Sequence, residues 1–212
     1  IALVQAQDRD DWELIIADDG SQDESPHIAC RLAQADPRLT VLPAPEGSAA
    51  SGAAAARNRA LAVAQGRYIA FLDADDLWRP HKLTRQLSAI TAAGGAAFCC
   101  SAYEVHRPSR PAHIRQVPAR MTRADLLRGN RIGCLTAIYD TRSLGKQPMP
   151  DIPMRHDYAL LLHLLTLTPE AIGVDAALAD HRRRPQSLSA RGWHASRATW
   201  RMLHSVGRIL RG

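Results

Sequence analysis

The chain has 212 residues, of which 46% are apolar and 23% charged, and this is the composition of a globular protein with one good-sized core. It excludes the disordered, collagen-like and coiled-coil classes. No apolar run approaches the roughly 18 to 20 residues of a membrane span, and the sequence does not open with a basic and then apolar signal segment. The formal charge of +6 and the pI of about 9.6 favour a polyanionic partner, namely phosphates on a small molecule, an anionic membrane surface or nucleic acid; a solvated basic surface is the alternative.

The positive charge is concentrated late in the chain. Residues 181–184 read HRRR, and residues 191–212 contain five more arginines. The four cysteines show no metal-ligand spacing. Two of them, Cys99 and Cys100, are adjacent in an apolar run, so we expect them to be buried and reduced, as in a cytosolic protein.

The first hundred residues alternate between strand and helix patterns, which predicts an α/β fold with a partly parallel sheet. In chain order we expect the end of a helix within 1–12, a strand over 13–20, a helix after it, a strand over 39–44, a small-residue loop and helix over 47–66, a strand over 67–73, a helix over 80–95 and a strand over 96–105. The helix after the first strand has two possible starts. Ser25 before Pro26 fits an N-cap, and Ser21 with Glu24 fits a capping box.

The second half has a less regular pattern. We expect a loop or edge hairpin over 106–120, a short helix over 122–130, a strand over 134–140, a helix over 155–167 and a last strand over 170–178. There is no internal repeat and no linker that would divide the chain, so the sequence predicts a single domain over 1–212.

Three carboxylates, Asp73, Asp75 and Asp76, follow the apolar run YIAFL directly. Open α/β sheets place ligands at such strand ends. Carboxylates that converge there repel one another unless a cation lies between them, and Mg²⁺ or Mn²⁺ prefers such oxygen ligands. For Asp76 alone, a place at the start of the next helix is a competing interpretation.

A second acidic pair, Asp18 and Asp19, ends an earlier buried strand before Gly20. Such a carboxylate can accept hydrogen bonds from a base or a ribose, although Asp-Gly is also a common turn. The following stretch SGAAAARNRAL has neither a GxGxxG nor a Walker pattern. Arg57 lies among small residues there, either to face a ligand or to extend its stem along the core.

Four segments together resemble one family. DDGSQD, GAAAARNRALAVAQGRYIAFLDADDLWRPHKL, IYDTRSLGKQPMPDIPMRHDYALLLHLL and HRRRPQSLSA are similar, in this order, to segments of the family 2 glycosyltransferases with the GT-A fold. The later segments resemble bacterial polysaccharide members, including teichuronic-acid-type enzymes. The resemblance covers roughly residues 5–190 and implies a mixed central sheet flanked by helices, in a Rossmann-like nucleotide-diphospho-sugar transferase fold.

For the donor, the resemblance implies a UDP-sugar, with a hexose as the sugar, and Mn²⁺ or Mg²⁺ as cofactor. Asp18 and Asp19 would contact uridine, and Arg57 would help to hold the base end. Asp73 and Asp75 would form the DxD pair, with Asp75 as the direct metal ligand and Asp73 as a contact to the ribose or the metal.

For the acceptor, the resemblance implies a cell-surface glycan or a lipid-linked glycan. Asp157 matches the catalytic aspartate, which would deprotonate the acceptor hydroxyl in an inverting transfer, and the start of a helix is its structural alternative. His156 stands where the family often has an acid. Arg182 and Arg183 would steady the diphosphate, because guanidinium groups suit phosphate oxygens.

These implications divide the chain into a nucleotide-sugar half (1–105), an acceptor and catalytic half (106–190) and a basic amphipathic helix (191–212). That helix either contacts an anionic membrane or packs on the domain. We therefore expect a cytoplasmic enzyme that can lie on the inner face of the cell membrane.

Family members usually begin with a strand that forms part of the base pocket, whereas residue 1 here already lies in the helix that would follow it. Without that strand the sheet would lose a buried member, and nucleotide affinity and stability would suffer. The alternatives are therefore a truncated, inactive relative that binds nucleotide-sugars, or a basic nucleic-acid-binding domain. Low aromatic content and the lack of a reader motif weigh against nucleic acid as a partner.

Overall fold

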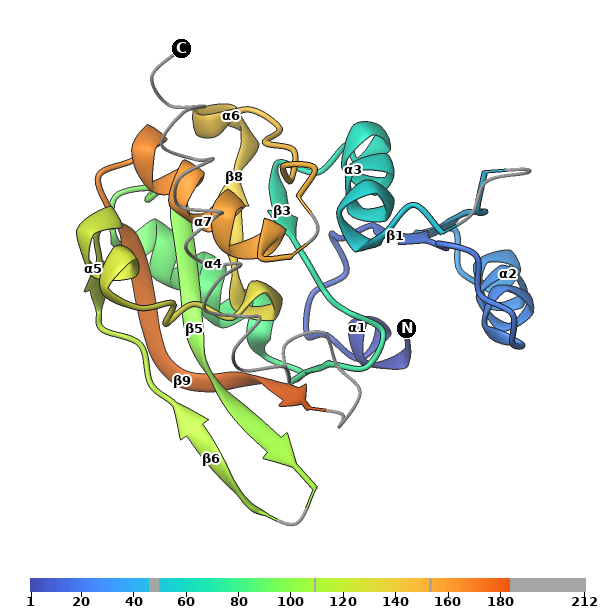
Figure 1. The fold of residues 1–212 in the computed structure, drawn as a ribbon, viewed down its shortest axis with the longest axis horizontal. Helices are drawn as coiled ribbons and strands as arrows, with labels where there is room; N and C mark the ends of the chain where they lie inside the picture. The colour runs from blue at the N-terminus through green and yellow to red at the C-terminus, as the bar shows by residue number, and fades with distance from the viewer. Residues whose placement is uncertain (46–49, 109, 153, 184–212) are drawn as a thin grey trace.

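The computed structural model describes residues 1–45, 50–108, 110–152 and 154–183, and its helices and strands alternate through the first half of the chain (Figure 1). The first-half elements are α1 (Ala2–Gln5), β1 (Leu14–Ala17), α2 (Ser25–Ala35), β2 (Leu39–Leu42), α3 (Ala53–Val63), β3 (Tyr68–Ala70), β4 (Leu77–Trp78), α4 (Lys82–Ala92) and β5 (Phe98–Arg107). The second-half elements are β6 (Arg110–Arg115), β7 (Arg120–Met121), α5 (Arg123–Arg128), the 3-10 turn η1 (Cys134–Thr136), β8 (Ile138–Asp140), α6 (Thr141–Leu144), α7 (His156–Leu167) and β9 (Ala171–Arg182).

The strands form two sheets. β1 and β2 pair in parallel, and a seven-stranded sheet has the order β3-β8-β5-β9-β4, with β6 paired to β5 and β7 paired to β9. Within the larger sheet β5 and β9 are parallel and the other pairs are antiparallel. The sheet is therefore mixed, as the sequence predicts.

Helices cover both faces of the larger sheet. Phe98 and Cys100 of β5 pack in one cluster with α7, and Cys99, which points to the other face, packs with Ile90 of α4. α7 contains the run YALLLHLL and has seven buried residues, as expected for a helix that is apolar almost all round. The predicted burial of Cys99 and Cys100 is confirmed, because neither has any exposed surface.

Several local predictions need correction. The N-cap of α2 is Glu24, and no side chain caps it, so neither predicted start of that helix is right. The predicted strand over 134–140 begins as the 3-10 turn η1 and is extended only in β8. The last strand, β9, continues to Arg182 because it pairs with β5 along its whole second half. Residues 106–120 form an edge hairpin through β6, which was one of the two predicted forms.

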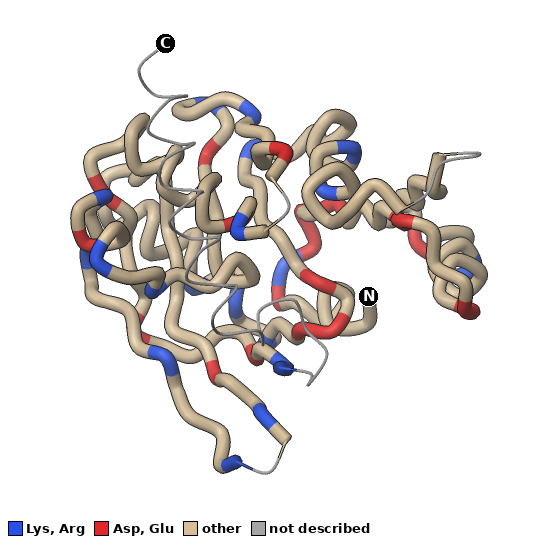
Figure 2. The backbone as a smooth tube through the Cα atoms, viewed as in Figure 1, with Lys and Arg blue, Asp and Glu red and all other residues tan. Residues whose placement is uncertain are grey.

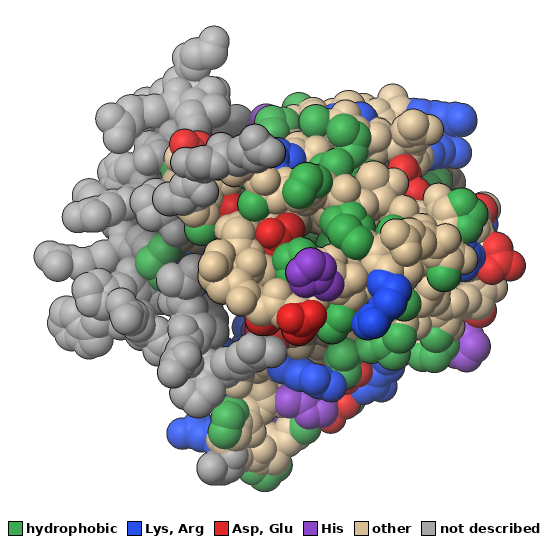
Figure 3. Space-filling view, turned by 90° about the vertical axis from the view of Figure 1, so that its right-hand side faces the viewer, with side chains coloured by type: hydrophobic (Ala, Val, Ile, Leu, Met, Phe, Trp, Pro, Cys, Tyr) green, Lys and Arg blue, Asp and Glu red, His purple; other side chains and the backbone are tan. Residues whose placement is uncertain are grey.

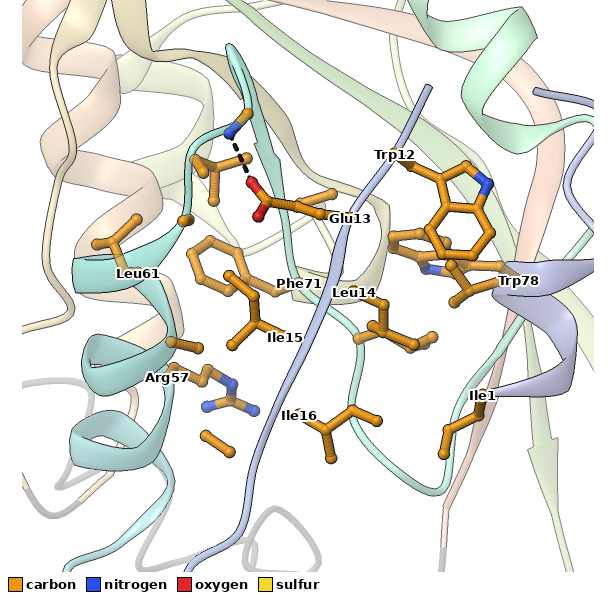
Figure 4. A pocket seen from close by; sticks show the side chains of 18 of the residues that line it. Ile1, Trp12, Glu13, Leu14, Ile15, Ile16, Arg57, Leu61, Phe71 and Trp78 are labelled. Carbon is orange, nitrogen blue, oxygen red and sulfur yellow. Dashed lines mark hydrogen bonds between the residues drawn. The ribbon is translucent and has the colours of Figure 1, made fainter. Parts of the chain in front are cut away.

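A gap separates the two sheets. Among the described residues, no strand pairs with the edge of β1 that faces away from β2, or with the edge of β3 that faces away from β8. A cavity of about 1230 Å³ lies there, lined by apolar side chains of β1, α3 and the β3–β4 segment (Figure 4). The apolar lining includes Leu14, Ile15, Ile16, Leu61, Phe71 and Trp78. Both walls of this slot are thus largely apolar, as is typical of surfaces that contact a buried strand.

The surface is mixed in character. On the face turned to the viewer in Figure 3, acidic, basic and apolar side chains are interspersed, so no single sign of charge dominates that face. No helix in the described ranges is long and apolar enough to cross a bilayer. The predicted basic helix over 191–212 lies outside the described residues.

Candidate active site

Arg57 connects three segments at one end of the cavity. Its Nη2 forms an ion pair with Asp73 Oδ1, and its Nη1 lies 2.8 Å from Nε2 of His156. Only 17% of the Arg57 side chain is exposed. Burial opposes the charge of Arg57, but the surrounding carboxylates, Asp73 first, outweigh it and raise the pKa of Arg57 above its ordinary value. The arginine thus joins α3, the loop after β3 and the start of α7.

The small residues of α3 allow this close approach. Ala54 and Ala56 are buried on the inner side of the helix, as the Gly/Ala-rich pattern predicts. Asn58 was not singled out from the sequence, yet its side chain donates to the carbonyl of Met149 and accepts from the Met149 N–H, both at 2.8 Å. The sequence did contain a signal for Asn58, since it is a second polar residue next to Arg57 in an alanine-rich helix. Asn58 fixes the segment before α7 to the helix that carries Arg57.

The acidic loop between β3 and β4 divides its carboxylates between two roles. Asp76 is buried, and its Oδ1 lies 2.9 Å from Nδ1 of His181 and accepts from the N–H of Arg182 at 3.2 Å. This hydrogen bond raises the pKa of His181 despite its burial. Asp76 does not cap a helix, since α4 begins only at Lys82, so that interpretation is wrong. Asp76 instead attaches the loop to the end of β9.

Asp73 and Asp75 stay partly exposed in the same loop. The Asp73 side chain is 43% exposed, and one of its oxygens pairs with Arg57 while the residue lines the cavity. The loop therefore offers carboxylate oxygens beside a cavity, and this donor set fits a hard divalent cation such as Mg²⁺ or Mn²⁺. Asp73 and Asp75 are the residues that would hold it.

A different cluster has metal-ligand spacing within the described part of the chain. Glu104, His106 and Asp180 bring their ligand atoms within 4.8 Å of one another. Arg79 donates to both acids, at 2.6 Å to Glu104 and 2.9 Å to Asp180, so a guanidinium already provides the positive charge between them. Asp180 is the neighbour of His181 on β9 and Glu104 is the register partner of Asp180 on β5, so these side chains lie on the face opposite to His181, the residue that contacts Asp76.

Asp18 and Asp19, at the end of β1, accept hydrogen bonds from nearby backbone N–H groups. Asp18 accepts from the N–H groups of Gly20 and Ser21, at 3.1 and 3.2 Å, which is an Asp-Gly turn. The hydrogen bond with Ser21 lowers the pKa of Asp18. Asp19 accepts from Ser51 Oγ and from the Gly52 N–H, both at 2.8 Å, and so ties β1 to the start of α3. Asp19 also lines the cavity.

Asp157 lies in the first turn of α7 and is partly exposed. Its charge acts on the thiol of Cys134, a residue that the sequence analysis did not place at the site. Burial raises the pKa of Cys134 well above its usual range, and Asp157 adds to this, so the thiol stays protonated. Burial also lowers the pKa of His156, and the charge of Arg57 lowers it further. The start of α7 thus meets η1 and Arg57 in one place.

Arg182 and Arg183 end the described part of the chain on opposite faces of β9. The backbone N–H of Arg182 donates to Asp76. Its side chain is exposed and, by strand alternation, lies on the same face of β9 as Asp180. The N–H of Arg183 donates to the carbonyl of His106 at 2.9 Å. If strand alternation is continued one residue past β9, the Arg183 side chain, and not that of Arg182, falls on the His181 side.

Residues 1–145 of the chain match the sequence model of a protein family, Glycosyl transferase family 2. The chain belongs to glycosyl transferase family 2. It is 36% identical over 200 residues to TuaG of Bacillus subtilis, which is named as a teichuronic acid biosynthesis glycosyltransferase, covering 93% of this chain and 78% of TuaG. It is 32% identical over 204 residues to WfgD of Escherichia coli, named as a UDP-Glc:alpha-D-GlcNAc-diphosphoundecaprenol beta-1,3-glucosyltransferase, covering 96% of this chain and 78% of WfgD.

Solved structures of other glycosyltransferases share the fold. The S. aureus TarS 1-349 complex with UDP-GlcNAc superposes with a TM-score of 0.72 at 18% identity, over 90% of this chain and 55% of TarS 1-349. The Pyrobaculum calidifontis mannosyltransferase PcManGT, in complex with GDP-Man and Mn²⁺, gives a TM-score of 0.62 at 21% identity, over 100% of this chain and 59% of PcManGT. This chain thus spans a little over half the length of either neighbour. The family 2 membership and the GT-A fold that the sequence implied are both confirmed.

Proposed function

We propose that this family 2 glycosyltransferase transfers a sugar from a UDP-sugar, with inversion, to a cell-surface or lipid-linked glycan. One observation carries the proposal: Arg57 links Asp73, on the donor side of the cavity, to His156, the neighbour of Asp157 on the acceptor side. The names of two similar proteins support the substrate classes. The TarS structure is a complex with UDP-GlcNAc, and WfgD is named for a diphosphoundecaprenol-linked acceptor.

Residues 1–105 would provide the donor site. Asp18 and Asp19 would contact the uridine, and Arg57 would hold the base end of the nucleotide. Asp75 and Asp73 would hold Mn²⁺ or Mg²⁺, which when bound neutralises the departing diphosphate. A hexose is the donor sugar that we propose, because the TarS and WfgD names both specify hexose-type donors.

Residues 106–190 would provide the acceptor site. Asp157 would take the proton of the acceptor hydroxyl as that oxygen forms its bond to the sugar. Its place in the first turn of α7 puts it beside the positive end of the helix dipole. Arg57 and His156 would hold this turn against the donor side. The resemblance assigns both Arg182 and Arg183 to a diphosphate, but they lie on opposite faces of β9, so we keep this contact for Arg183 alone.

The enzyme would act at the inner face of the cell membrane, where its lipid-linked acceptor would lie. The basic segment 191–212 would contact anionic lipid there. This location accounts for the excess of arginine late in the chain without a nucleic-acid partner.

Calorimetric titration with UDP in Mn²⁺ tests the donor site. We expect wild-type protein to bind UDP and Asp75→Ala to lose at least tenfold in affinity, since a hard ligand to the cation is removed. Asp175→Ala, an exposed acid on β9, is the matched control and should bind as the wild type does. Unchanged UDP affinity in Asp75→Ala would contradict the proposal.

Release of UDP in a donor and acceptor screen tests the reaction itself. Asp157→Asn should keep UDP affinity and lose transfer by at least a hundredfold, because the amide cannot accept the proton. A wild-type protein that binds UDP but transfers no sugar under any combination would support the inactive alternative instead.

A further inference from the structure

Arginines outnumber acids on the projecting β5–β6 hairpin, whose strands contain Arg107, Arg110 and Arg115 and one acid, Glu104. No Asp or Glu occurs between Glu104 and Asp125, and all six residues of β6 are exposed. Figure 2 shows blue segments along this hairpin at the lower edge of the molecule. The hairpin leaves the sheet next to the end of β9, where His181 meets Asp76 of the acidic loop.

Strand register places three arginines on one face of this region. From Tyr103 onward, alternate residues of β5 share a face, so Arg107 lies on the side of Tyr103. Arg115 of β6 is directly opposite Tyr103 in the antiparallel pair and has the same orientation. The ring of His181 packs edge-on to Tyr103 at 6.4 Å, so Arg183, two residues further along, points to this face as well.

Two acids of these strands, Glu104 and Asp180, lie on the opposite face. Glu104 and Asp180 are register partners, and both bind Arg79 there. They therefore give no direct compensation to the arginines on the Tyr103 side. Burial and the like charges of Arg107 and Arg115 lower the pKa of Arg183, which agrees with the crowding of positive charge that the register predicts.

Arg155 adds a fourth guanidinium from another element. It precedes α7 and is the non-glycine residue with positive φ within the described ranges, at φ 68°. A left-handed conformation is unfavourable for an arginine, so the surrounding structure must hold the backbone at this position. Its charge acts on Arg183 together with those of Arg107 and Arg115.

Two of these side chains keep a buried donor unused. Nε of Arg107 and Nε of Arg155 are buried and have no hydrogen-bond partner among the described residues. An unmet buried N–H is unfavourable, and a ligand oxygen would remove that penalty. Arg115, in contrast, is exposed and makes only a long contact of 3.4 Å to the carbonyl of Asn130.

We propose that these four residues, Arg107, Arg115, Arg155 and Arg183, form an arginine cluster that binds the phosphate or diphosphate of the acceptor. Guanidinium forks bind such oxygens in pairs, and several converging forks suit a diphosphate better than a single charge. The assignment to the acceptor rests on the proposed function, because Arg155 is two residues from Asp157. Two residues span at most roughly 7 Å, which is comparable to one sugar unit between the acceptor hydroxyl and its phosphate.

Binding of inorganic pyrophosphate in EDTA tests the cluster without the donor cation. By calorimetry we expect the wild type to bind, and Arg107→Gln/Arg155→Gln to lose at least tenfold in affinity. Arg107→Lys/Arg155→Lys should fall in between, because it keeps the charge and loses the fork. The matched control is Arg120→Gln/Arg128→Gln, which changes the net charge by the same amount. In the wild type these two arginines pair with Glu170 and Asp125, outside the cluster. This control should bind pyrophosphate as the wild type does.

Two further arms identify the source of the phosphate. A large excess of UDP in the same EDTA buffer should leave the pyrophosphate affinity within about twofold. In a separate titration with Mn²⁺ and without pyrophosphate, the Gln variant should keep its UDP affinity. Phosphatidylglycerol vesicles should not compete with pyrophosphate. Equal pyrophosphate affinity in the Gln variant and the control would overturn the cluster. Competition by UDP would assign the site to the donor diphosphate instead of the acceptor. Competition by vesicles would assign it to a lipid headgroup.

Failure of this proposal can be distinguished from failure of the proposed function. If the wild type fails to bind UDP while the Gln variant still loses pyrophosphate affinity, the donor proposal fails and the anion site stands. Thermal melts of each variant, followed by circular dichroism, ensure that only folded proteins are compared. A Gln variant that does not fold leaves the comparison of the Lys variant with the control to decide, with equal affinities again overturning the cluster.

Discussion

Nη1 of Arg57 lies 2.8 Å from Nε2 of His156, and this contact determines the protonation state of the histidine. An arginine can only donate, so Nε2 must accept and the ring must be neutral. Burial first, and then the charge of Arg57, lowers the pKa of His156, while Asp157 and Asp73 act in the other direction. A neutral histidine is therefore a structural requirement of the contact between α3 and α7.

The pH dependence of stability should report this histidine. In the unfolded chain its pKa is about 6.5, and in the folded chain it is lower, so below that pH the unfolded state binds more protons and stability falls with falling pH. His156→Gln, whose amide oxygen also accepts from Arg57, should lose part of this acid slope. Urea unfolding at pH 7.5 and pH 5.5 measures it. His27→Gln, at an exposed position on α2, should keep the wild-type slope; equal slopes in all three proteins would refute the neutral assignment.

The second prediction separates two neighbouring acids. Asp76→Ala should lower the free energy of unfolding by about 1–3 kcal/mol, because a buried acceptor for His181 and the Arg182 N–H is lost. Asp75→Ala, at a partly exposed position, should change it by no more than about 0.5 kcal/mol. Denaturant unfolding at pH 6 measures both, and a larger loss in Asp75→Ala would contradict the division of roles.

The stability that the Asp76–His181 hydrogen bond contributes should depend on pH. The hydrogen bond to Asp76 raises the pKa of His181, so its added stability is fully present below about pH 6.5 and is lost as the pH rises through the folded value. The stability deficit of Asp76→Ala should therefore be larger at pH 6 than at pH 8.5. A deficit that grows with pH would show that His181 is not the partner that matters.

The order of elements could be predicted because it depends on local patterns. The strand before Asp18, the small-residue helix α3 and the helix that contains Asp157 all follow from periodicity and turn residues within short windows. The resemblance then gave the family, because it compares many positions at once.

Contacts between distant segments could not be predicted in this way. Asp76 binds His181 across 105 residues, and Asn58 binds Met149 across 91. No local pattern encodes either contact, since both depend on which strand pairs with which. The arginine cluster has the same origin: its hairpin members become neighbours of Arg183 only through the pairing of β5 with β6 and β9.

The third prediction concerns the slot beside β1. The N–H groups of Leu14 and Asp18 donate to β2, so by alternation those of Ile15 and Ala17 face the slot. We expect these two amides to exchange with solvent much faster than the amide of Ile16, which faces β2. An alternating Val/Thr segment of about six residues fused before Ile1 should slow that exchange and raise Tm by several degrees if it pairs there, and a Gly/Ser fusion of equal length is the control. Equal exchange at Ile15 and Ile16 in the unextended chain would show that the edge is not open.

The last prediction concerns Lys82, which has no exposed surface and no hydrogen-bond partner for Nζ within the described residues. Burial lowers its pKa to about 7, although Nζ lies 4.2 Å from the centre of the Trp78 ring. In the unfolded chain the pKa is about 10.4, so between pH 10 and pH 7 the unfolded state binds the extra proton and the wild type loses stability as the pH falls. Lys82→Met, which keeps the length of the side chain, should therefore be more stable than the wild type at pH 7.5, by on the order of 3 kcal/mol, and this advantage should shrink towards pH 10. Urea unfolding across this range measures the difference, with Lys146→Met as an exposed control. A variant less stable than the wild type at pH 7.5 would mean that the contact of Lys82 with Trp78 outweighs its desolvation.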